Sequence, residues 1–230
     1  MTQEVQKPQL SAAILDLYKG SRLFNQAANG GLSKERLENQ LNTVKEEAKE
    51  LLISHQEKNR LELVDAIIDC LYTGSELVMI IDGNEDLLED TPKFYEEDLE
   101  NSEATLFACL GALAAGNYYS FLCYAEDLAA TIEGYDMAGA VKHISDSNDS
   151  KFVPISWLEE NDLTIKEMEL TILREGRYTE VFSKKVDYKG VPSVVFMAKF
   201  DKQENTRYEQ GKVVKPKGYF IEPNLALFIQ

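Results

Sequence analysis

The sequence predicts a mainly α-helical protein: a four-helix bundle with a small α+β region near the carboxyl terminus. Three observations predict this fold. Apolar residues recur at helical spacing through most of residues 1–151. The connections between these periodic segments are short, as they are in helix bundles. After Lys151 the composition changes to β-branched and aromatic residues on both sides of a tight-turn sequence.

Helix signals divide the first part of the chain. A helix that begins near Leu10 is expected to end at Asn29-Gly30-Gly31, because glycine favours the conformation that ends helices. Ser33 is the expected N-cap of the next helix, and Asp82-Gly83-Asn84 is expected to end the third. The predicted helices cover residues 10–28, the segment after Ser33, 59–81, 103–133 and 136–144.

The last third of the chain carries strand signals. Residues 177–186 and 191–200 are rich in β-branched and aromatic side chains. The sequence Asp187-Tyr188-Lys189-Gly190 between them is typical of a hairpin turn. Residues 167–173 are expected to add a third strand.

Charge is distributed unevenly along the chain. Residues 1–150 hold 11 Lys and Arg against 28 Asp and Glu, a net of −17, whereas residues 151–230 hold 13 against 12, a net of +1. This change indicates two regions of different kinds. We expect a helical domain at 1–151, a small strand-containing insertion at 152–210, and a tail at 211–230 that returns to the helical domain.

The net charge of −16 disfavours sequence-independent nucleic-acid binding, because such a surface repels polyanions. Three cysteines without metal-ligand spacing, and an amino terminus without a secretory pattern, lead us to expect reduced thiols and a cytoplasmic protein. Residues 104–125 carry no charge, but their glycines, Asn117 and tyrosines disfavour a membrane span. A buried central helix or a subunit interface is expected there.

Two pairs of acidic residues carry the expected chemistry. Glu47 and Glu50 are one turn apart on one predicted helix, and Glu62 and Asp65 repeat this spacing on the next. Asp69 extends the second face by one more turn. If the two helices pack antiparallel, the pairs face each other and raise each other's pKa. Mg²⁺ relieves such repulsion, because it takes oxygen ligands from carboxylates and from substrate phosphates.

A solvated acidic face is the competing interpretation, since 40 of the 230 residues are Asp or Glu. A single pair of carboxylates would favour that interpretation. Two matched pairs on consecutive helices favour a shared site instead. The acids of the second helix also alternate with apolar residues, namely Leu61, Val64, Ile67 and Ile68.

This acidic pattern resembles the signature of the all-α nucleotide pyrophosphohydrolases. Glu46-Glu47-x-x-Glu50 followed by Glu62-x-x-Asp65 is similar to the motif of MazG-type enzymes, dimeric dUTPase relatives and phosphoribosyl-ATP pyrophosphohydrolase-like proteins. The run from Glu62 to Tyr72 resembles the phage branch of that family, which would place the protein in a host cytoplasm.

Two later segments also resemble the phage branch: the run from Ser147 to Phe152, and the tail from Gly211 to Leu225 with its Gly-Lys-Val-x-Lys pattern. In the family these segments are near neighbours, whereas here residues 153–210 separate them. The gap between the acidic motifs is also short for the family. The resemblance implies a MazG-like four-helix bundle for the helical part.

The resemblance also implies a reaction and a role for each residue. In the family, water attacks a metal-bound triphosphate, which gives a nucleoside monophosphate and pyrophosphate. The implied ligands of Mg²⁺, with Mn²⁺ as an alternative, are Glu47, Glu50, Glu62 and Asp65. Glu46 would orient or deprotonate the water. The implied substrate contacts are Asp69, Asn148, Lys151 and Lys215.

We therefore expect a hydrolase of a nucleoside triphosphate, with deoxynucleotides favoured, that forms a homodimer or homotetramer and has no nucleic-acid or membrane partner. Phosphoribosyl-ATP is less favoured, because the histidine-pathway members are compact and lack these extensions. The alternative is a catalytically silent nucleotide-binding or protein-interaction module that uses residues 153–210 as its partner surface. Glu46 argues against this alternative, because a binding protein does not need it.

Overall fold

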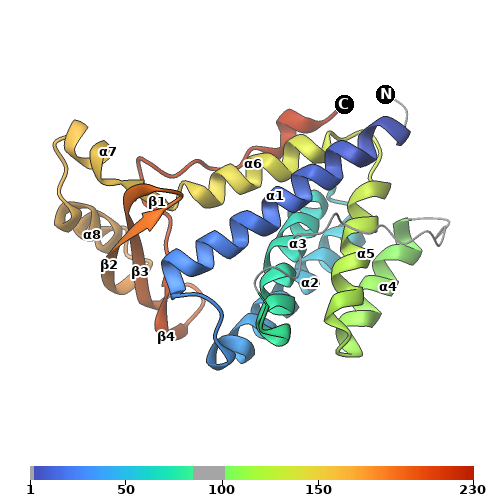
Figure 1. The fold of residues 1–230 in the computed structure, drawn as a ribbon, viewed down its shortest axis with the longest axis horizontal. Helices are drawn as coiled ribbons and strands as arrows, with labels where there is room; N and C mark the ends of the chain where they lie inside the picture. The colour runs from blue at the N-terminus through green and yellow to red at the C-terminus, as the bar shows by residue number, and fades with distance from the viewer. Residues whose placement is uncertain (1–2, 85–101) are drawn as a thin grey trace. The chain divides into compact units, whose positions relative to one another are not determined.

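A computed structural model describes residues 3–84 and 102–230 of the chain (Figure 1). It divides into two compact units. The helical unit comprises Met1–Arg22, Leu32–Ser145 and Pro223–Gln230, and the sheet unit comprises Leu23–Gly31 and Asp146–Glu222. The expected mainly α architecture with a small sheet in the carboxyl-terminal part is confirmed.

The helical unit contains the elements that carry the acidic motifs. Its helices are α1 (Gln3–Asn29), α2 (Leu37–Glu57), α3 (Arg60–Asp82), α4 (Ser102–Ala114), α5 (Tyr118–Thr131) and α6 (Met137–Asp149), with 3₁₀ turns η1 (Lys34–Arg36) and η2 (Leu225–Phe228). The last residues of α1 and α6 belong to the sheet unit. Ser33 is an N-cap as expected, but it caps η1, where its hydroxyl accepts a hydrogen bond from the N–H of Glu35.

The prediction of a single helix over residues 103–133 is wrong, because the chain forms the two helices α4 and α5 there. Gly116 has a φ of +74°, a conformation that glycine adopts at little cost and that ends α4. The side chain of Asn117 then accepts a hydrogen bond from the N–H of Ser120 and caps α5. Of the two expectations for residues 104–125, the buried central helix is wrong, since Phe107 is 55% exposed, and the subunit interface stays a prediction. None of the helices in the described residues is long and apolar enough to cross a membrane.

The core of the helical unit is built mainly from α1, α3, α5 and α6. Ile14 and Leu17 of α1 and Leu71 of α3 are fully buried in it. Gly74 lets α3 and α5 approach closely, because a Cβ at this position would lie only 3.0 Å from Cε1 of Phe121. The acidic side chains of α2 and α3 are therefore carried by helices that are anchored in a continuous apolar core.

One acidic residue lies inside this core. Glu126 of α5 is 4% exposed, and its Oε1 accepts a hydrogen bond of 2.5 Å from the hydroxyl of Tyr18. Burial raises the pKa of Glu126 to about 7, although the hydrogen bond from Tyr18 acts in the opposite direction and Asp127 adds to the rise. The Glu126 carboxyl is therefore largely protonated in the folded protein up to about neutral pH.

The sheet unit has four strands and two helices of its own. They are β1 (Phe152–Pro154), α7 (Ile155–Glu160), α8 (Ile165–Arg174), β2 (Tyr178–Tyr188), β3 (Val191–Asp201) and β4 (Thr206–Val213). All pairings are antiparallel, with β3 in the centre. β2 pairs along one side of β3, and β1 and β4 pair with successive parts of the other side. The expected hairpin of β2 and β3 is confirmed.

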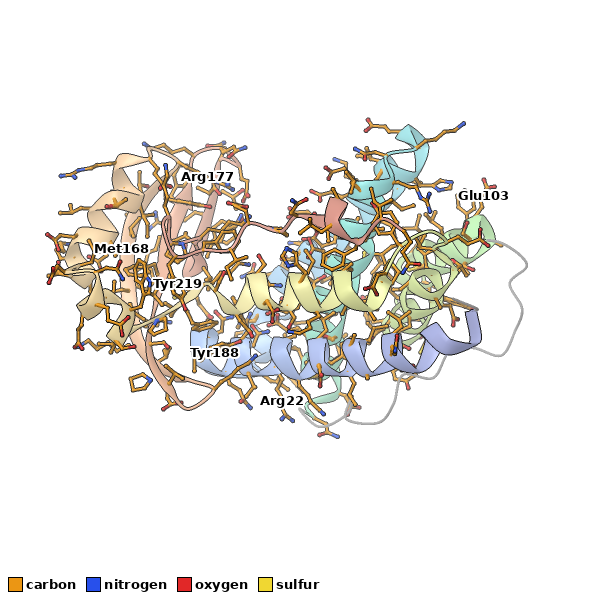
Figure 2. All side chains as sticks on the ribbon, turned by 90° about the horizontal axis from the view of Figure 1, so that it is seen from above. Arg22, Glu103, Met168, Arg177, Tyr188 and Tyr219 are labelled. Atoms are coloured by element: carbon orange, nitrogen blue, oxygen red, sulfur yellow. The ribbon has the colours of Figure 1, made fainter. Side chains whose placement is uncertain are left out.

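The prediction of a third strand over residues 167–173 is wrong, because this segment lies in helix α8. Thr164 and Glu167 form a reciprocal capping box that starts the helix. Met168 and Ile172 lie one turn apart and are buried in the core of the sheet unit. Figure 2 labels Met168 on this helix. The helical spacing of the apolar residues therefore outweighs the β-branched content of the segment.

The boundaries of the three expected regions stay predictions, but two structural facts bear on them. β4 continues across residue 210, so residues 211–213 belong to the sheet. Residues 223–230 lie in the helical unit, where the N–H of Asp136 donates to the carbonyl of Phe228. The part of the tail that belongs to the helical unit thus begins at Pro223.

An ion pair between the half-exposed Arg177 and the buried Asp201 lies at one end of the sheet, at the start of β2 and the end of β3. Oδ2 of Asp201 accepts hydrogen bonds of 3.0 and 2.7 Å from Nε and Nη2 of Arg177. Arg177 is labelled in Figure 2. Oδ1 accepts from the backbone N–H groups of Gln203 and Glu204. Burial raises the pKa of Asp201, but these hydrogen bonds outweigh burial and the pKa is lowered. The carboxylate therefore stabilises the turn into β4 as well as the strand pair.

We predict that Asp201→Asn lowers the free energy of unfolding of the sheet unit by about 1.5–3 kcal/mol, the usual value of hydrogen bonds to a charged group. Because the pKa of Asp201 is lowered in the folded state, this contribution is present above about pH 4 and is lost as pH falls further. Urea unfolding followed by the fluorescence of Trp157, the one tryptophan in the sequence, measures it. Glu209→Gln, at a side chain that is 84% exposed, is the control. Equal midpoints for both variants and wild type would contradict the prediction.

We also predict that Glu126→Gln removes a pH dependence from the stability of the helical unit. The folded pKa of Glu126 is raised, so its contribution to stability is fully present below about pH 4.5 and is lost as pH rises to about 7. The free energy of unfolding of wild type should therefore fall relative to that of the variant across this range. Circular dichroism during urea unfolding at pH 5 and pH 8 tests this. A constant difference between the two proteins would refute it.

Candidate active site

The expected catalytic motifs lie on a helical hairpin formed by α2 and α3. Only Lys58 and Asn59 separate the two helices. Lys58 takes a φ of 56°, which ends α2, and the side chain of Asn59 accepts a hydrogen bond from the N–H of Glu62, which starts α3. Figure 1 shows α2 and α3 side by side. The expected antiparallel packing follows from so short a connection.

Two polar contacts define how α2 faces α3 far from the connecting turn. Nε2 of Gln40 donates a hydrogen bond of 2.8 Å to the carbonyl of Thr73. One turn nearer the start of α2, Nη2 of Arg36 lies 2.7 Å from Oε1 of Glu76. In the register set by these contacts, Glu47 of α2 faces the turn of α3 that carries Asp65 and Asp69.

Glu47 is the centre of the acidic cluster, which we define as Glu46, Glu47, Glu50, Asp65 and Asp69. Its side chain is half-buried, as are those of Asp65 and Asp69, while Glu46 and Glu50 are exposed. Burial raises the pKa of Glu47 to about 9, with further increases from the charges of Asp69, Glu50, Asp65 and Glu46, in that order. The structure thus brings carboxylates of both motifs close enough to repel one another.

Glu62 stands at the edge of this arrangement. It is exposed in the first turn of α3, where its backbone N–H is occupied by the cap of Asn59. Its side chain is not among the groups that raise the pKa of Glu47. Its assignment as a metal ligand stays a prediction.

The cysteines near the cluster are not nucleophiles. Cys70 and Cys109 are fully buried, and burial raises the pKa of both thiols, that of Cys109 to about 12. A reactive cysteine needs a thiolate, which these surroundings disfavour. Chemistry at this site therefore depends on carboxylates.

The chemistry of the donor set suits a hard cation, because all side-chain donors of the cluster are carboxylate oxygens. Within residues 3–84 and 102–230, no three His, Cys, Asp or Glu side chains are already arranged to hold a metal ion. Mg²⁺ is commonly bound by one or two carboxylates, water and substrate phosphates.

The other expected substrate contacts lie in the sheet unit, and their role stays a prediction. Nζ of Lys151 donates a hydrogen bond of 2.7 Å to Oδ1 of Asn148, so these two residues form one polar pair. Lys215 is more than half exposed, lies 3.7 Å from a carboxylate oxygen of Glu222, and sits over the ring of Phe220.

Arg36, Gln40 and Glu76 also belong to this hairpin, although no motif in the sequence marks them. Glu76 continues the acidic face of α3 by two turns beyond Asp69, and Gln40 continues the face of α2 by two turns before Glu47. Helical spacing places Gln40 and Glu76 on these faces, but the pairing of Arg36 with Glu76 depends on the register between the two helices.

We predict that Glu47→Gln stabilises the metal-free protein. The folded pKa of Glu47 is raised to about 9, so its contribution to stability is present below about pH 4.5 and is lost as pH rises toward 9. In EDTA the thermal midpoint of the variant should therefore exceed that of wild type at pH 8 and approach it at pH 5. Glu57→Gln, at an exposed residue in the last turn of α2, is the control. A lower midpoint for Glu47→Gln at pH 8 would show that the cluster is not strained by repulsion.

Comparison with known proteins gives one match. Residues 25–79 match the family model of phosphoribosyl-ATP pyrophosphohydrolase. Searches of curated proteins and of solved structures gave no match. The matched segment runs from the end of α1 through most of α3 and contains the whole acidic cluster. It indicates nucleotide pyrophosphohydrolase activity. Residues 25–79 are thus similar to a family of the MazG-like all-α nucleoside triphosphate pyrophosphohydrolase superfamily.

Proposed function

We propose that the protein hydrolyses a nucleoside triphosphate to the monophosphate and pyrophosphate in a reaction that depends on Mg²⁺. The observation that carries this proposal is the meeting of half-buried carboxylates from α2 and α3 within the segment that matches the family, where burial, and then the neighbouring carboxylates, raise the pKa of Glu47 to about 9. A repulsive cluster of this kind is costly unless a cation occupies it.

The residues that would hold Mg²⁺ are Glu47, Glu50, Glu62 and Asp65, with Mn²⁺ as an alternative ion. When bound, the metal neutralises phosphate charge and stabilises the charge that develops on the oxygens of an in-line displacement. Asp69, which ranks first among the charges that act on Glu47, lies close to the same position.

Glu46 is proposed as the general base. It neighbours Glu47 on α2 and is exposed, so its carboxylate is accessible to water. An ionised carboxylate can accept a proton from the attacking water as the new bond to phosphorus forms. The anhydride bond between the α- and β-phosphates then breaks, and pyrophosphate leaves.

Deoxynucleoside triphosphates are the proposed substrate class. Phosphoribosyl-ATP is the competing substrate, because the matching family is named after it. The match covers residues 25–79, and 151 residues follow it. The sheet unit lies almost entirely in this part of the chain, and a compact phosphoribosyl-ATP enzyme does not need it.

A homodimer or homotetramer is part of the proposal. The exposed face of α4 supports it, because this face is apolar and carries Ala104, Phe107, Gly111 and Ala114. Small residues on an exposed helix face allow another helix to approach closely.

The experiment that tests the proposal is a pyrophosphate-release assay with the eight common nucleoside triphosphates and phosphoribosyl-ATP, with Mg²⁺ and with EDTA. We predict release from one or more triphosphates only with Mg²⁺. Asp65→Asn and Glu46→Gln should lower kcat by about 10²-fold or more, because each removes a charge or base that acts in the transition state. Glu57→Gln should match wild type. Near-wild-type turnover by Asp65→Asn would refute the ligand assignment. No pyrophosphate from any substrate would leave the silent binding module as the better account.

A further inference from the structure

The far end of the α2–α3 hairpin is joined by polar contacts that are themselves buried. The side chains of Arg36 and Glu76 are 13% and 7% exposed, and Gln40 is 6% exposed. These contacts connect the first turn of α2 to the second half of α3. The turn at Lys58 and Asn59 connects the other ends.

The acidic cluster lies between these two connections. Half-buried carboxylates stand on both helices here, Glu47 on α2 and Asp65 and Asp69 on α3, and like charges placed this way repel each other across the cluster. Unopposed, such repulsion would separate the helices where no covalent link holds them, at the start of α2. The Arg36–Glu76 and Gln40–Thr73 contacts are placed where they oppose this movement.

Stability alone does not explain a buried ion pair at this place. Removing two charges from water is costly, and well-packed apolar residues of similar size often stabilise a protein equally or better. The best-attested use of buried polar pairs is to specify one arrangement of packed helices. Gln40 adds a directional bond, because its amide must reach the carbonyl of Thr73 in one register.

We propose that Arg36, Gln40 and Glu76 are positioning residues. They hold α2 against α3 so that the carboxylate of Glu47 stays opposite Asp65 and Asp69. This inference rests on the proposed metal-dependent function of the cluster. The three residues act through the position of Glu47 and contact neither substrate nor metal.

The paired variant Arg36→Met with Glu76→Leu tests this proposal. It removes the ion pair without changing net charge, so the long-range attraction of a cation to the cluster is unchanged. Apolar replacement of both partners should leave the thermal midpoint in EDTA unchanged or higher. The dissociation constant for Mn²⁺, measured by electron paramagnetic resonance, should rise about tenfold or more, as it does when supporting contacts of a metal site are lost.

The control is Arg207→Met with Glu180→Leu, the same exchange at an exposed pair in the sheet unit, which should bind Mn²⁺ like wild type. The reversed pair Arg36→Glu with Glu76→Arg rebuilds the ion pair and should recover most of the affinity. Gln40→Leu should weaken Mn²⁺ binding, whereas Gln56→Leu, at an exposed position of α2, should not.

A second experiment measures the distance between α2 and α3 in the metal-free protein. Spin labels on cysteines introduced at the exposed residues Asn39 and Asp82 report the distance between the start of α2 and the end of α3, and the native cysteines are buried. The paired variant should broaden or shift this distance distribution, and the reversed pair should restore it. Wild-type distances in the paired variant would overturn the proposal, as would wild-type Mn²⁺ affinity. If the wild-type protein binds no Mn²⁺, the proposed function fails, and the distance measurement alone decides the positioning role.

Discussion

Repulsion between carboxylates across the α2–α3 hairpin is the interaction on which the arrangement of the helical unit depends. The pKa of the half-buried Glu47 is raised to about 9, so above pH 4.5 this residue destabilises the folded state. The folded protein must either keep a proton on Glu47 or hold a charge that its neighbours repel. Three other features of the unit hold α2 and α3 together around Glu47. A two-residue turn fixes one end of the hairpin, polar side chains fix the other, and the apolar core anchors α3 through Leu71 and Gly74.

Comparison with the other buried acids shows why the cluster is distinctive. Asp201 in the sheet unit stays ionised because the guanidinium of Arg177 and two backbone N–H groups satisfy both carboxylate oxygens. The pKa of Glu126 is raised instead, because burial favours its protonated form. The hydroxyl of Tyr18 donates a hydrogen bond to it. For Glu47, burial and the charges of the neighbouring carboxylates all raise the pKa, and no contact lowers it among the causes that act on it. Under the proposed function, a bound cation would relieve this repulsion.

Local signals in the sequence were sufficient for much of the fold. The α2 and α3 helices and the β2–β3 hairpin follow from periodicity, caps and a turn sequence. The misread segments failed for separate physical reasons. In α8 the capping box and apolar spacing decide the conformation, and at Gly116 one positive φ divides an uncharged segment into two helices. β4 was missed because its residues are mostly polar and exposed. The acidic motifs were found, but Arg36 and Glu76 were not, because their meaning depends on the register between two helices.

The central claim is that the carboxylates of α2 and α3 share one divalent cation when substrate is present. Crystals grown with Mn²⁺ and a non-hydrolysable deoxynucleoside triphosphate analogue test it most directly, because anomalous scattering locates the metal independently of the protein geometry. The account predicts a manganese peak within about 2.5 Å of oxygens from both helices, with Glu47 and Asp65 among them, and a phosphate oxygen as a further ligand. A peak bound by one helix alone, or a nucleotide bound away from the hairpin, would contradict it.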